Sequence, residues 1–489
     1  MSTQPQSLRD LLAGIAVPAG DIRVSGLTLD SRRVRTGDVF VALRGASAHG
    51  ITFAPAALAQ GASAILAEGP ASAASLPADA PIVWIEHLRE HTGEIAARFF
   101  GRPAQALHVI GVTGTNGKTS IVQLLAVALQ DLGVRAATIG TLGAGFVGAL
   151  EAGECTTPDA ISMQGLLAQF RDAGASHVAM EVSSHALDQG RVNAVDFEVA
   201  VFTNLTRDHL DYHATMENYG AAKAKLFAWP GLRTAVINVD DAFGRELVAK
   251  LPTSVQALRY AIDTQAEIRA RDVRASGDGL AFELITPWGT GVIHSALLGR
   301  FNVYNLLAVA GCLGALGYTF AQIRNALAQL QPVTGRMNRL GGGSVPLVVI
   351  DYAHTPDALE QSLASLRAHC SGQLICVFGC GGERDAGKRP QMGAIAETLA
   401  DRVFVTDDNP RGEDGDAIVA QILAGLAQPT RANVQRDRAA AIAQALLAAH
   451  AGDVVLIAGK GHEPYQESGG VKRAFDDADV ARRALEARA

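Results

Sequence analysis

Apolar runs alternate with polar or glycine-rich loops through the middle of the chain. Within residues 106 to 338, such runs occur at His177–Val182, Val199–Asn204 and Thr234–Val239. Continuous apolar strands separated by helices are typical of a parallel sheet that is covered on both faces. Residues Ala266–Pro287 alternate instead between apolar and polar side chains, which predicts an antiparallel flap. The pattern of this block therefore predicts an α/β domain.

A helix pattern at Phe301–Leu316 lies near the end of the middle block. The chain before the middle block has a separate pattern of strands and helices. Residues 1 to 105 contain short strand patterns at Asp38–Leu43 and Ala64–Ala67, with an alanine-rich helix pattern around Ala54–Gln60 between them. Strands and helices that alternate in this way predict a separate, small α/β domain.

Residues 339 to 489 form the third block, which begins near Leu340–Gly343. We interpret that glycine-rich segment as a flexible joint. The strand patterns that follow, each leading into a polar or glycine-rich loop, are Leu347–Asp351, Leu374–Phe378, Val403–Thr406 and Val454–Ala458. The helix patterns between them predict a doubly wound sheet with its ligands at the carboxyl ends of the strands.

The composition suits a globular chain of several domains. Its 489 residues exceed what one core supports, and 48% of them are hydrophobic against 19% charged. The net charge of -7 disfavours nucleic acid or an anionic membrane as a partner. No apolar run of about 18 residues occurs, so neither a membrane span nor a signal peptide is predicted. The five cysteines form no Cys-x-x-Cys pair, which favours buried thiols, with Cys380 among its glycines as the candidate for exposure.

One glycine-rich segment carries the strongest chemical signal. Gly111-Val112-Thr113-Gly114-Thr115-Asn116-Gly117-Lys118-Thr119 lies between a strand pattern at Leu107–Ile110 and a helix pattern at Ile121–Leu132. Such a turn cradles phosphate with its backbone N–H groups, while the lysine reaches the terminal phosphates and the following threonine supplies a hydroxyl for Mg²⁺. The common pattern has glycine in place of Val112, so a glycine-rich loop with a surface lysine is the alternative. The strand–loop–helix context favours ATP or GTP binding.

Polar side chains also follow other strand patterns of the middle block. Glu181 ends one strand, where a carboxylate near a phosphate loop can hold Mg²⁺. Thr203–His213 brings acidic and imidazole side chains together after another strand, which indicates a metal or phosphate site. A solvated carboxylate and a solvated loop are the alternatives. Lys223 lies on a helix pattern, and the composition of that segment predicts an ordinary surface lysine.

In the third block, Asp407–Arg411 and Gly459–Glu463 each follow a strand pattern. Neighbouring strands deliver their loops to one edge of a sheet, so we expect Glu463 to lie near Arg411. An acid and a base at one edge would suit a zwitterionic amino acid, because arginine offers a planar fork that matches a carboxylate.

In their order along the chain, these segments resemble the motifs of the Mur ligase family, which also has this glycine spacing in its phosphate loop. The resemblance spans essentially the full chain and is carried by Thr113–Thr119, Met180–His185, Thr203–His213, Gly299–Asn305, Asp351–Asp357 and Gly459–Glu463. Asp408-Asn409-Pro410-Arg411 further resembles the motif of the members that add meso-diaminopimelate. Diaminopimelate carries an extra carboxylate, and a site that buries it needs a cation. A substrate without this carboxylate would leave the cation unpaired.

The resemblance implies a fold class and a reaction. The fold is α/β with three domains: a small uridine-binding domain (1–105), a central P-loop parallel-sheet ATPase domain (106–338) and a C-terminal Rossmann-like doubly wound domain (339–489). The reaction is that of a cytoplasmic, monomeric ligase that phosphorylates the D-Glu carboxylate of UDP-N-acetylmuramoyl-L-alanyl-D-glutamate with ATP and then adds meso-2,6-diaminopimelate. The product serves peptidoglycan synthesis, and thereby cell-wall biogenesis, cell shape and cell division. Domain closure is expected to assemble the site and to exclude water.

The resemblance also implies the residues that hold ATP and metal. The catalytic set is Lys118, Lys223 and His209. Two Mg²⁺ ions are expected at Thr119, Glu181, His209 and Lys223, the last carbamylated by CO₂ to N6-carboxylysine, with Lys225 as the alternative lysine. The ATP set is Gly114, Thr115, Asn116, Gly117, Lys118, Thr119, Ser120, Asn302, Arg336, Asp351 and His354.

The other two substrates have sets of their own. The set for the nucleotide-linked dipeptide is Ser31, Thr156, Thr157, Ser184, Gln189 and Arg191. Pro158 stands where relatives have glycine, which alters the expected shape of that loop. The diaminopimelate set is Arg384, Asp408, Asn409, Arg411, Gly459 and Glu463.

Two other functions compete with this one. A folylpolyglutamate synthase shares the phosphate loop and the Asp351–His354 type of segment, but it lacks a uridine-binding domain like the one expected in residues 1 to 105. A nucleotide-switch protein would need a guanine-reading Asn-Lys-x-Asp motif, and the sequence contains none.

Overall fold

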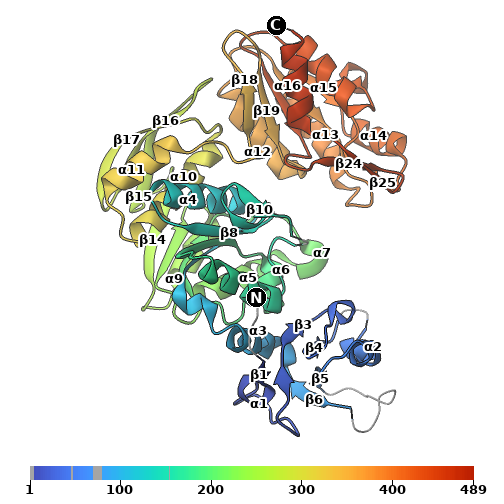
Figure 1. Cartoon of the computed structure of the whole chain (residues 1–489). Helices are drawn as coiled ribbons and strands as arrows, with labels where there is room; N and C mark the ends of the chain where they lie inside the picture. The colour runs from blue at the N-terminus through green and yellow to red at the C-terminus, as the bar shows by residue number, and fades with distance from the viewer. Residues whose placement is uncertain (1–4, 46–47, 70–79, 154, 489) are drawn as a thin grey trace. The chain divides into compact units, whose positions relative to one another are not determined.

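The computed structural model describes residues 5–45, 48–69, 80–153 and 155–488 (Figure 1). The chain divides into two compact units. The first comprises Met1–Ile237 with Glu246–Ala257, and the second comprises Asn238–Arg245 with Leu258–Ala489. Within the described ranges, no helix combines the length and the apolar character needed to cross a membrane.

A four-stranded parallel sheet in the first unit has the order β3-β4-β5-β6. Its strands are β3 (Gly26–Thr28), β4 (Asp38–Ala42), β5 (Ala64–Gly69) and β6 (Ile82–Glu86), after a short β1 (Gln6–Ser7), α1 (Leu8–Leu11) and β2 (Arg23–Val24). In β4, Val39 packs with α3 (Leu88–Phe99) and Phe40 packs with α2 (Ala54–Ala59). Both faces are thus covered, which explains the continuous apolar run of β4.

The phosphate loop belongs to an eleven-stranded sheet of the order β10-β9-β8-β11-β7-β12-β13-β14-β15-β16-β17, and the strands from β10 to β13 surround the loop. Its parallel strands are β7 (His108–Thr113), β8 (Ala136–Gly140), β11 (His177–Glu181), β12 (Phe197–Phe202) and β13 (Thr234–Asn238). The antiparallel hairpin β9 (Gly143–Phe146) and β10 (Ala149–Glu151) forms one edge. The connecting helices are α4 (Lys118–Asp131), α5 (Ala160–Asp172), α6 (Ser184–Asp188), α7 (Leu210–His213) and α8 (Met216–Ala224). The predicted parallel α/β pattern is confirmed.

The predicted antiparallel flap is also confirmed, in the second unit. It consists of β15 (Ile268–Ser276), β16 (Gly279–Thr286) and β17 (Gly289–Ser295). α9 (Ala242–Lys250) and β14 (Gln256–Ala261) precede it, and α10 (Arg300–Ala315) and α11 (Phe320–Gln329) follow. α10 is apolar on most sides because it is buried along most of its length.

A second sheet in this unit has the order β18-β19-β23-β20-β21-β22. The strands are β18 (Asn338–Gly341), β19 (Leu347–Asp351), β20 (Leu374–Phe378), β21 (Arg402–Val405), β22 (Asn433–Val434) and β23 (Val454–Ala458). One core holds α12 (Pro356–Arg367), α13 (Lys388–Leu399) and α14 (Gly415–Leu423), and another holds α15 (Arg438–Leu447) and α16 (Asp477–Glu486). A small hairpin, β24 (Tyr465–Ser468) and β25 (Val471–Ala474), precedes α16. Helices on both faces confirm the doubly wound prediction.

The predicted flexible joint at Leu340–Gly343 is wrong. Leu340 and Gly341 belong to β18, which pairs antiparallel with β19, and the glycines that follow turn the chain into that partner strand. Leu340 also packs against the core of α15 and α16. The glycines therefore serve a hairpin rather than a linker.

The predicted exposure of Cys380 is wrong as well. Only 3% of Cys380 is exposed, and its sulfur lies 3.7 Å from the sulfur of Met392 on α13. Cys155 is instead the exposed thiol of the described residues. Cys380 follows β20 so closely that its side chain still joins the core of the sheet.

Candidate active site

The phosphate loop lies between β7, which ends at Thr113, and α4, which begins at Lys118, as predicted. Gly114 has a φ of 146°, and a Cβ atom there would lie 1.8 Å from Thr203 Oγ1, so only glycine fits. The Lys118 ammonium donates to the carbonyls of Gly114 and Thr115, both at 2.8 Å. These bonds hold the lysine over its own loop, at a helix N-terminus whose dipole favours phosphate.

The rest of the loop is tied to the chain that follows β12. Thr115 N–H donates to Asn204 O and Asn116 N–H donates to Asn204 Oδ1, both at 2.9 Å. Gly117 caps α4, whose first turn contains Thr119 and Ser120. Asn204 belongs to the predicted polar segment Thr203–His213, but its support of the phosphate loop is not predicted from the sequence.

Lys223 on α8 is buried beside this loop. Only 1% of it is exposed; its ammonium donates to Gly114 O at 2.9 Å and lies 4.3 Å from the centre of the Tyr219 ring. Burial, together with the Lys118 cation, lowers the pKa of Lys223 well below its ordinary value. The interpretation of Lys223 as a surface lysine is therefore wrong. Lys225, the alternative lysine for carbamylation, is half exposed and pairs with Asp188.

Glu181 ends β11 and is also buried, with 1% exposed. Its Oε1 accepts from Thr141 N–H at 2.8 Å, and its Oε2 accepts from Thr141 Oγ1 at 3.2 Å. The hydroxyl of Thr156 lies 3.1 Å from the same threonine hydroxyl. Glu181 is therefore not the solvated carboxylate of the alternative interpretation.

His209 lies in a group of rings after β12. The backbone N–H of His209 donates to Asp208 Oδ1 at 2.8 Å, and the ring Nε2 lies 3.4 Å from Asp208 Oδ2. The centre of its ring is 4.9 Å from that of His185 and 6.0 Å from that of Tyr219, the ring that also contacts Lys223. Burial lowers the pKa of His209 from its ordinary value, which favours the neutral imidazole.

Besides Thr156, three more of the residues predicted for the nucleotide-linked dipeptide are hydrogen-bonded next to Glu181. The Thr157 hydroxyl donates to Glu181 O at 2.9 Å, and Arg191 Nη1 donates to Thr157 O at 3.0 Å. Gln189 Oε1 accepts from Arg191 Nε at 2.9 Å and from Arg191 Nη2 at 2.6 Å. The bonds to Gln189 and Thr157 fix the arginine in one orientation.

The two remaining residues of that set lie in different places. Ser184 begins α6, and its hydroxyl lies 2.9 Å from His213 Nε2 in the group of rings. Ser31 lies in the turn Ser31–Arg33 after β3, where its carbonyl accepts from Gln60 Nε2 at 3.0 Å. Ser31 thus lies next to the four-stranded sheet, in the turn that follows its strand β3.

The second unit holds the other predicted ATP residues. Asp351 ends β19 and accepts from Met337 N–H at 2.8 Å, and burial raises its pKa above the ordinary value. Arg336 lies 4.6 Å above the Tyr352 ring, whose centre is 4.6 Å from that of His354. These flat groups offer stacking surfaces of the kind that bind a nucleobase.

Asn302 contributes differently from the other ATP residues of the second unit. It lies buried on α10, its Nδ2 donates to Leu298 O at 2.7 Å, and its Oδ1 accepts from Asn305 Nδ2 at 2.8 Å. These contacts hold the Asn302 amide in one orientation on α10.

The predicted amino-acid residues meet at the carboxyl edge of the second sheet, after β20, β21 and β23. Arg411 Nη1 donates to Gly382 O at 2.6 Å, and the φ of Arg411 is 54°, a strained value for a residue other than glycine. A Cβ atom at Gly381 would lie 3.1 Å from Arg411 Nη1 and 3.8 Å from Arg384 Cγ, so both arginines flank that glycine. Strain at such an edge is typical of a binding loop.

The two loops after β21 and β23 are in direct contact. Asn409 Nδ2 donates to Glu463 Oε2 at 2.8 Å. Gly459 has a φ of 114°, and a Cβ atom there would lie 2.4 Å from Asp408 Oδ2. Burial raises the pKa of Asp408. The shared edge is as predicted, but the hydrogen bonds and ion pairs of the described residues do not join Glu463 to Arg411.

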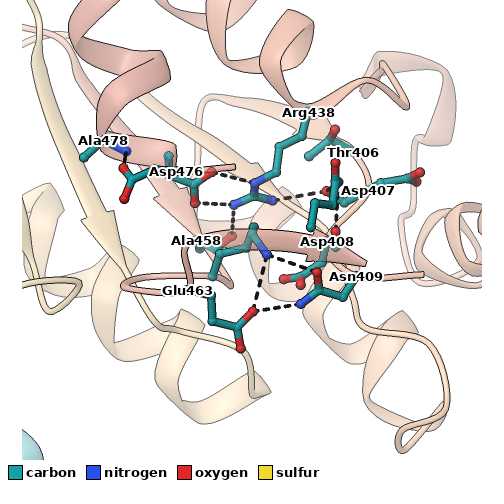
Figure 2. A network of polar contacts seen from close by, with 12 residues as sticks. Thr406, Asp407, Asp408, Asn409, Arg438, Ala458, Glu463, Asp476 and Ala478 are labelled. Carbon is teal, nitrogen blue, oxygen red and sulfur yellow. Dashed lines mark hydrogen bonds and ion pairs between the residues drawn. The ribbon is translucent and has the colours of Figure 1, made fainter. Parts of the chain in front are cut away.

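A network of buried polar contacts lies behind these loops (Figure 2). The Arg438 guanidinium donates through Nε and Nη2 to the two carboxylate oxygens of Asp477, both at 2.7 Å, and to the last carbonyl of β23 at 3.0 Å. Lys460 donates to Asn409 Oδ1 at 3.1 Å and to Glu463 Oε2 at 3.3 Å. Neither cation is among the residues predicted from the sequence, although a lysine between two glycines just after a buried strand is a signal for Lys460.

Family models match three parts of the chain: residues 23–100 match the Mur ligase family, catalytic domain; residues 112–313 match the Mur ligase middle domain; and residues 335–461 match the Mur ligase, glutamate ligase domain. The chain belongs to the Mur ligase family.

Within that family, the chain is similar to proteins that carry one name. A protein from Xanthomonas campestris is 60% identical over 99% of this chain and 98% of its own length. Another protein, from Pseudomonas aeruginosa, is 53% identical over 99% of this chain and 97% of its own length. Both are named UDP-N-acetylmuramoyl-L-alanyl-D-glutamate--2,6-diaminopimelate ligase. A solved structure of the same name is 39% identical, covers 99% of both chains and has a TM-score of 0.75.

Proposed function

We propose that this chain has the activity named by its relatives: it joins meso-2,6-diaminopimelate to UDP-N-acetylmuramoyl-L-alanyl-D-glutamate and uses ATP to do so. The observation that carries this proposal is the match of 53% to 60% identity over nearly the whole chain. The product is a precursor of peptidoglycan. We place the enzyme in the cytoplasm, where ATP and nucleotide-linked sugars are found, and propose that it acts as a monomer.

The reaction needs ATP because a carboxylate is a poor acylating agent. The D-Glu carboxylate attacks the terminal phosphorus of ATP, which forms an acyl phosphate and releases ADP. The diaminopimelate amine then attacks the acyl carbon, a proton leaves the nitrogen, and phosphate departs from the tetrahedral intermediate as the amide forms. Two anions meet in the first step, so the Lys118 cation lowers its barrier by offsetting their charge.

The donors around the phosphate loop fit Mg²⁺. Thr119 and Glu181 offer oxygen ligands, and we propose that they hold the ions with His209 and the carbamylated Lys223. Among the described residues, no three His, Cys, Asp or Glu side chains form a metal-binding group. Mg²⁺ is usually bound by one or two carboxylates together with substrate phosphates. Bound Mg²⁺ would neutralise charge as phosphate and carboxylate meet.

We propose that Lys223 is carbamylated. An amine adds to CO₂ only in its neutral form, and the burial that lowers the Lys223 pKa favours that form. The neutral amine nitrogen bonds to the carbon of CO₂ and loses one proton, so the side chain becomes an anion; counted from the ammonium form, two protons leave. This anion would supply the oxygen ligand for a second Mg²⁺.

Lys223→Ala should therefore slow phosphate release by about a hundredfold, an effect in the usual range for one lost electrostatic group. Short carboxylates such as acetate should restore part of the rate, because they can place an anion in the space that the side chain leaves. Steady-state rates with and without acetate measure this, with exposed Lys225→Ala as the matched control. No loss of rate in Lys223→Ala would contradict the carbamate.

The substrate-binding roles of the other residues are part of this proposal. The phosphate loop holds ATP with Asn302, Arg336, Asp351 and His354. The nucleotide-linked dipeptide is bound by Ser31, Thr156, Thr157, Ser184, Gln189 and Arg191. Diaminopimelate is bound by Arg384, Asp408, Asn409, Arg411, Gly459 and Glu463.

An omission experiment tests the function as a whole. With ATP, the nucleotide-linked dipeptide and diaminopimelate present, phosphate should be released and the mass of the nucleotide product should rise by one diaminopimelate minus water. Leaving out any one substrate should stop product formation. Phosphate release that is indifferent to the amino acid would point to a plain ATPase.

A further inference from the structure

Lys460 is a buried cation to which the proposed function assigns no role. It lies two residues after the end of β23, and none of its side chain is exposed (0%). Its ammonium donates to Asn409 Oδ1 at 3.1 Å and to Glu463 Oε2 at 3.3 Å. Burying a charge is unfavourable unless its partners replace water, so the contacts of Lys460 with these two residues are its compensation.

Lys460 sets the direction of the Asn409 amide. Asn409 Oδ1 accepts from the Lys460 ammonium and from Glu467 N–H at 2.9 Å, while Asn409 Nδ2 donates to Glu463 at 2.8 Å. A flipped amide would place its N–H₂ group against two donors and its oxygen against a carboxylate. The amide therefore has one favourable orientation, and the lysine is one of the two donors that impose it.

One oxygen of Glu463 is occupied and the other is not. Oε2 accepts from both Asn409 and Lys460, whereas Oε1 makes no hydrogen bond to the part of the chain that the structure describes. About a fifth of this side chain (21%) is exposed. Figure 2 shows one carboxylate oxygen of Glu463 turned away from the network. A carboxylate fixed through one oxygen presents the other to a cationic ligand, such as an ammonium group.

Lys460 is also part of the charge balance behind the loops. Burial raises the pKa of Asp408, and Glu463 and Asp477 raise it further, while Arg438 and Lys460 lower it. Arg438 is committed to Asp477 through two hydrogen bonds. Lys460 is therefore the cation of this pair that directly contacts Glu463, at 3.3 Å.

We propose that Lys460 is a positioning residue for the amino-acid substrate. It holds Asn409 and Glu463 so that the second oxygen of Glu463 accepts an ammonium group of the incoming diamino acid. Lys460 acts through these two side chains and does not touch the substrate. This inference rests on the proposed function, which it extends to a residue outside the predicted binding set.

Lys460→Met tests the inference, because methionine has a similar length and no charge. Its KM for diaminopimelate should rise about tenfold or more, while its KM for ATP and for the nucleotide-linked dipeptide stay within about twofold. The loss should deepen as the pH falls, since removing the Lys460 cation raises the Asp408 pKa further and that carboxylate then takes up a proton more readily. Lys460→Arg should recover part of the affinity, and exposed Lys472→Met should match the wild type.

The possible outcomes separate this inference from the function beneath it. A folded Lys460→Met with an unchanged KM for diaminopimelate, or with all three KM values raised alike, would overturn the inference alone. Failure of both Lys460→Met and Lys460→Gln to fold, judged by circular dichroism, would also overturn it, because the lysine would then serve the fold. A wild-type enzyme that ignores diaminopimelate would overturn the proposed function together with the inference.

Discussion

Lys118→Ala is expected to abolish ATP-dependent phosphate release, with a loss of at least about a hundred- to a thousandfold in kcat. The ammonium of Lys118 is held over the loop by the carbonyls of Gly114 and Thr115, so it is in place before ATP arrives. Alanine removes the one side-chain cation of this loop, and the developing negative charge then lacks its nearest compensation. A continuous phosphate-release assay with all three substrates measures the effect.

Exposed Lys250→Ala is the control for this experiment, since Lys250 lies at the end of α9 with most of its side chain in solvent. It should keep the wild-type rate. Retained turnover in a folded Lys118→Ala protein would remove the phosphate-loop assignment, and with it the role of ATP at this site.

Arg411→Ala should weaken the use of diaminopimelate far more than the binding of ATP or of the nucleotide-linked dipeptide. The loss of one charge-assisted pair with the far carboxylate of the amino acid should cost about 2–5 kcal/mol in kcat/KM for diaminopimelate. Arg411 is suited to this task because its backbone is strained and its Nη1 is held by Gly382 O at 2.6 Å. Initial rates at varied diaminopimelate, with the other substrates saturating, give the change.

Arg473→Ala offers a matched control, because Arg473 is an exposed arginine on the nearby hairpin strand β25. It should leave all three KM values unchanged. If Arg411→Ala kept the wild-type KM for diaminopimelate, Arg411 would not bind the substrate and the selection of the amino acid would need another explanation.

Most elements could be predicted because their patterns are local. The run from Val39 to Ala42 is apolar because helices cover both faces of β4, and the alternation around β15 and β16 marks a flap. The glycines after Leu340 were misinterpreted because a hairpin turn and a linker use the same residues. Only the pairing with β19 distinguishes the two, and that pairing depends on distant residues.

The candidate site was predictable in its motifs but not in its supports. Lys223 looks like any surface lysine in sequence, and its burial depends on Gly114, more than a hundred residues earlier. Arg438 stands at the start of an alanine-rich helix, and nothing in that pattern points to Asp477. Buried charges are paired through tertiary contacts, so a single sequence shows the charge without showing its partner.

The most direct test of the account is a phosphate-release assay of the purified enzyme with ATP, the nucleotide-linked dipeptide and either meso-diaminopimelate or lysine. The account predicts rapid release with diaminopimelate and a kcat/KM at least about a hundredfold lower with lysine, which lacks the carboxylate that pairs with Arg411. Equal rates with the two amino acids would contradict the selection that we assign to the second unit, and no release with either would contradict the proposed function.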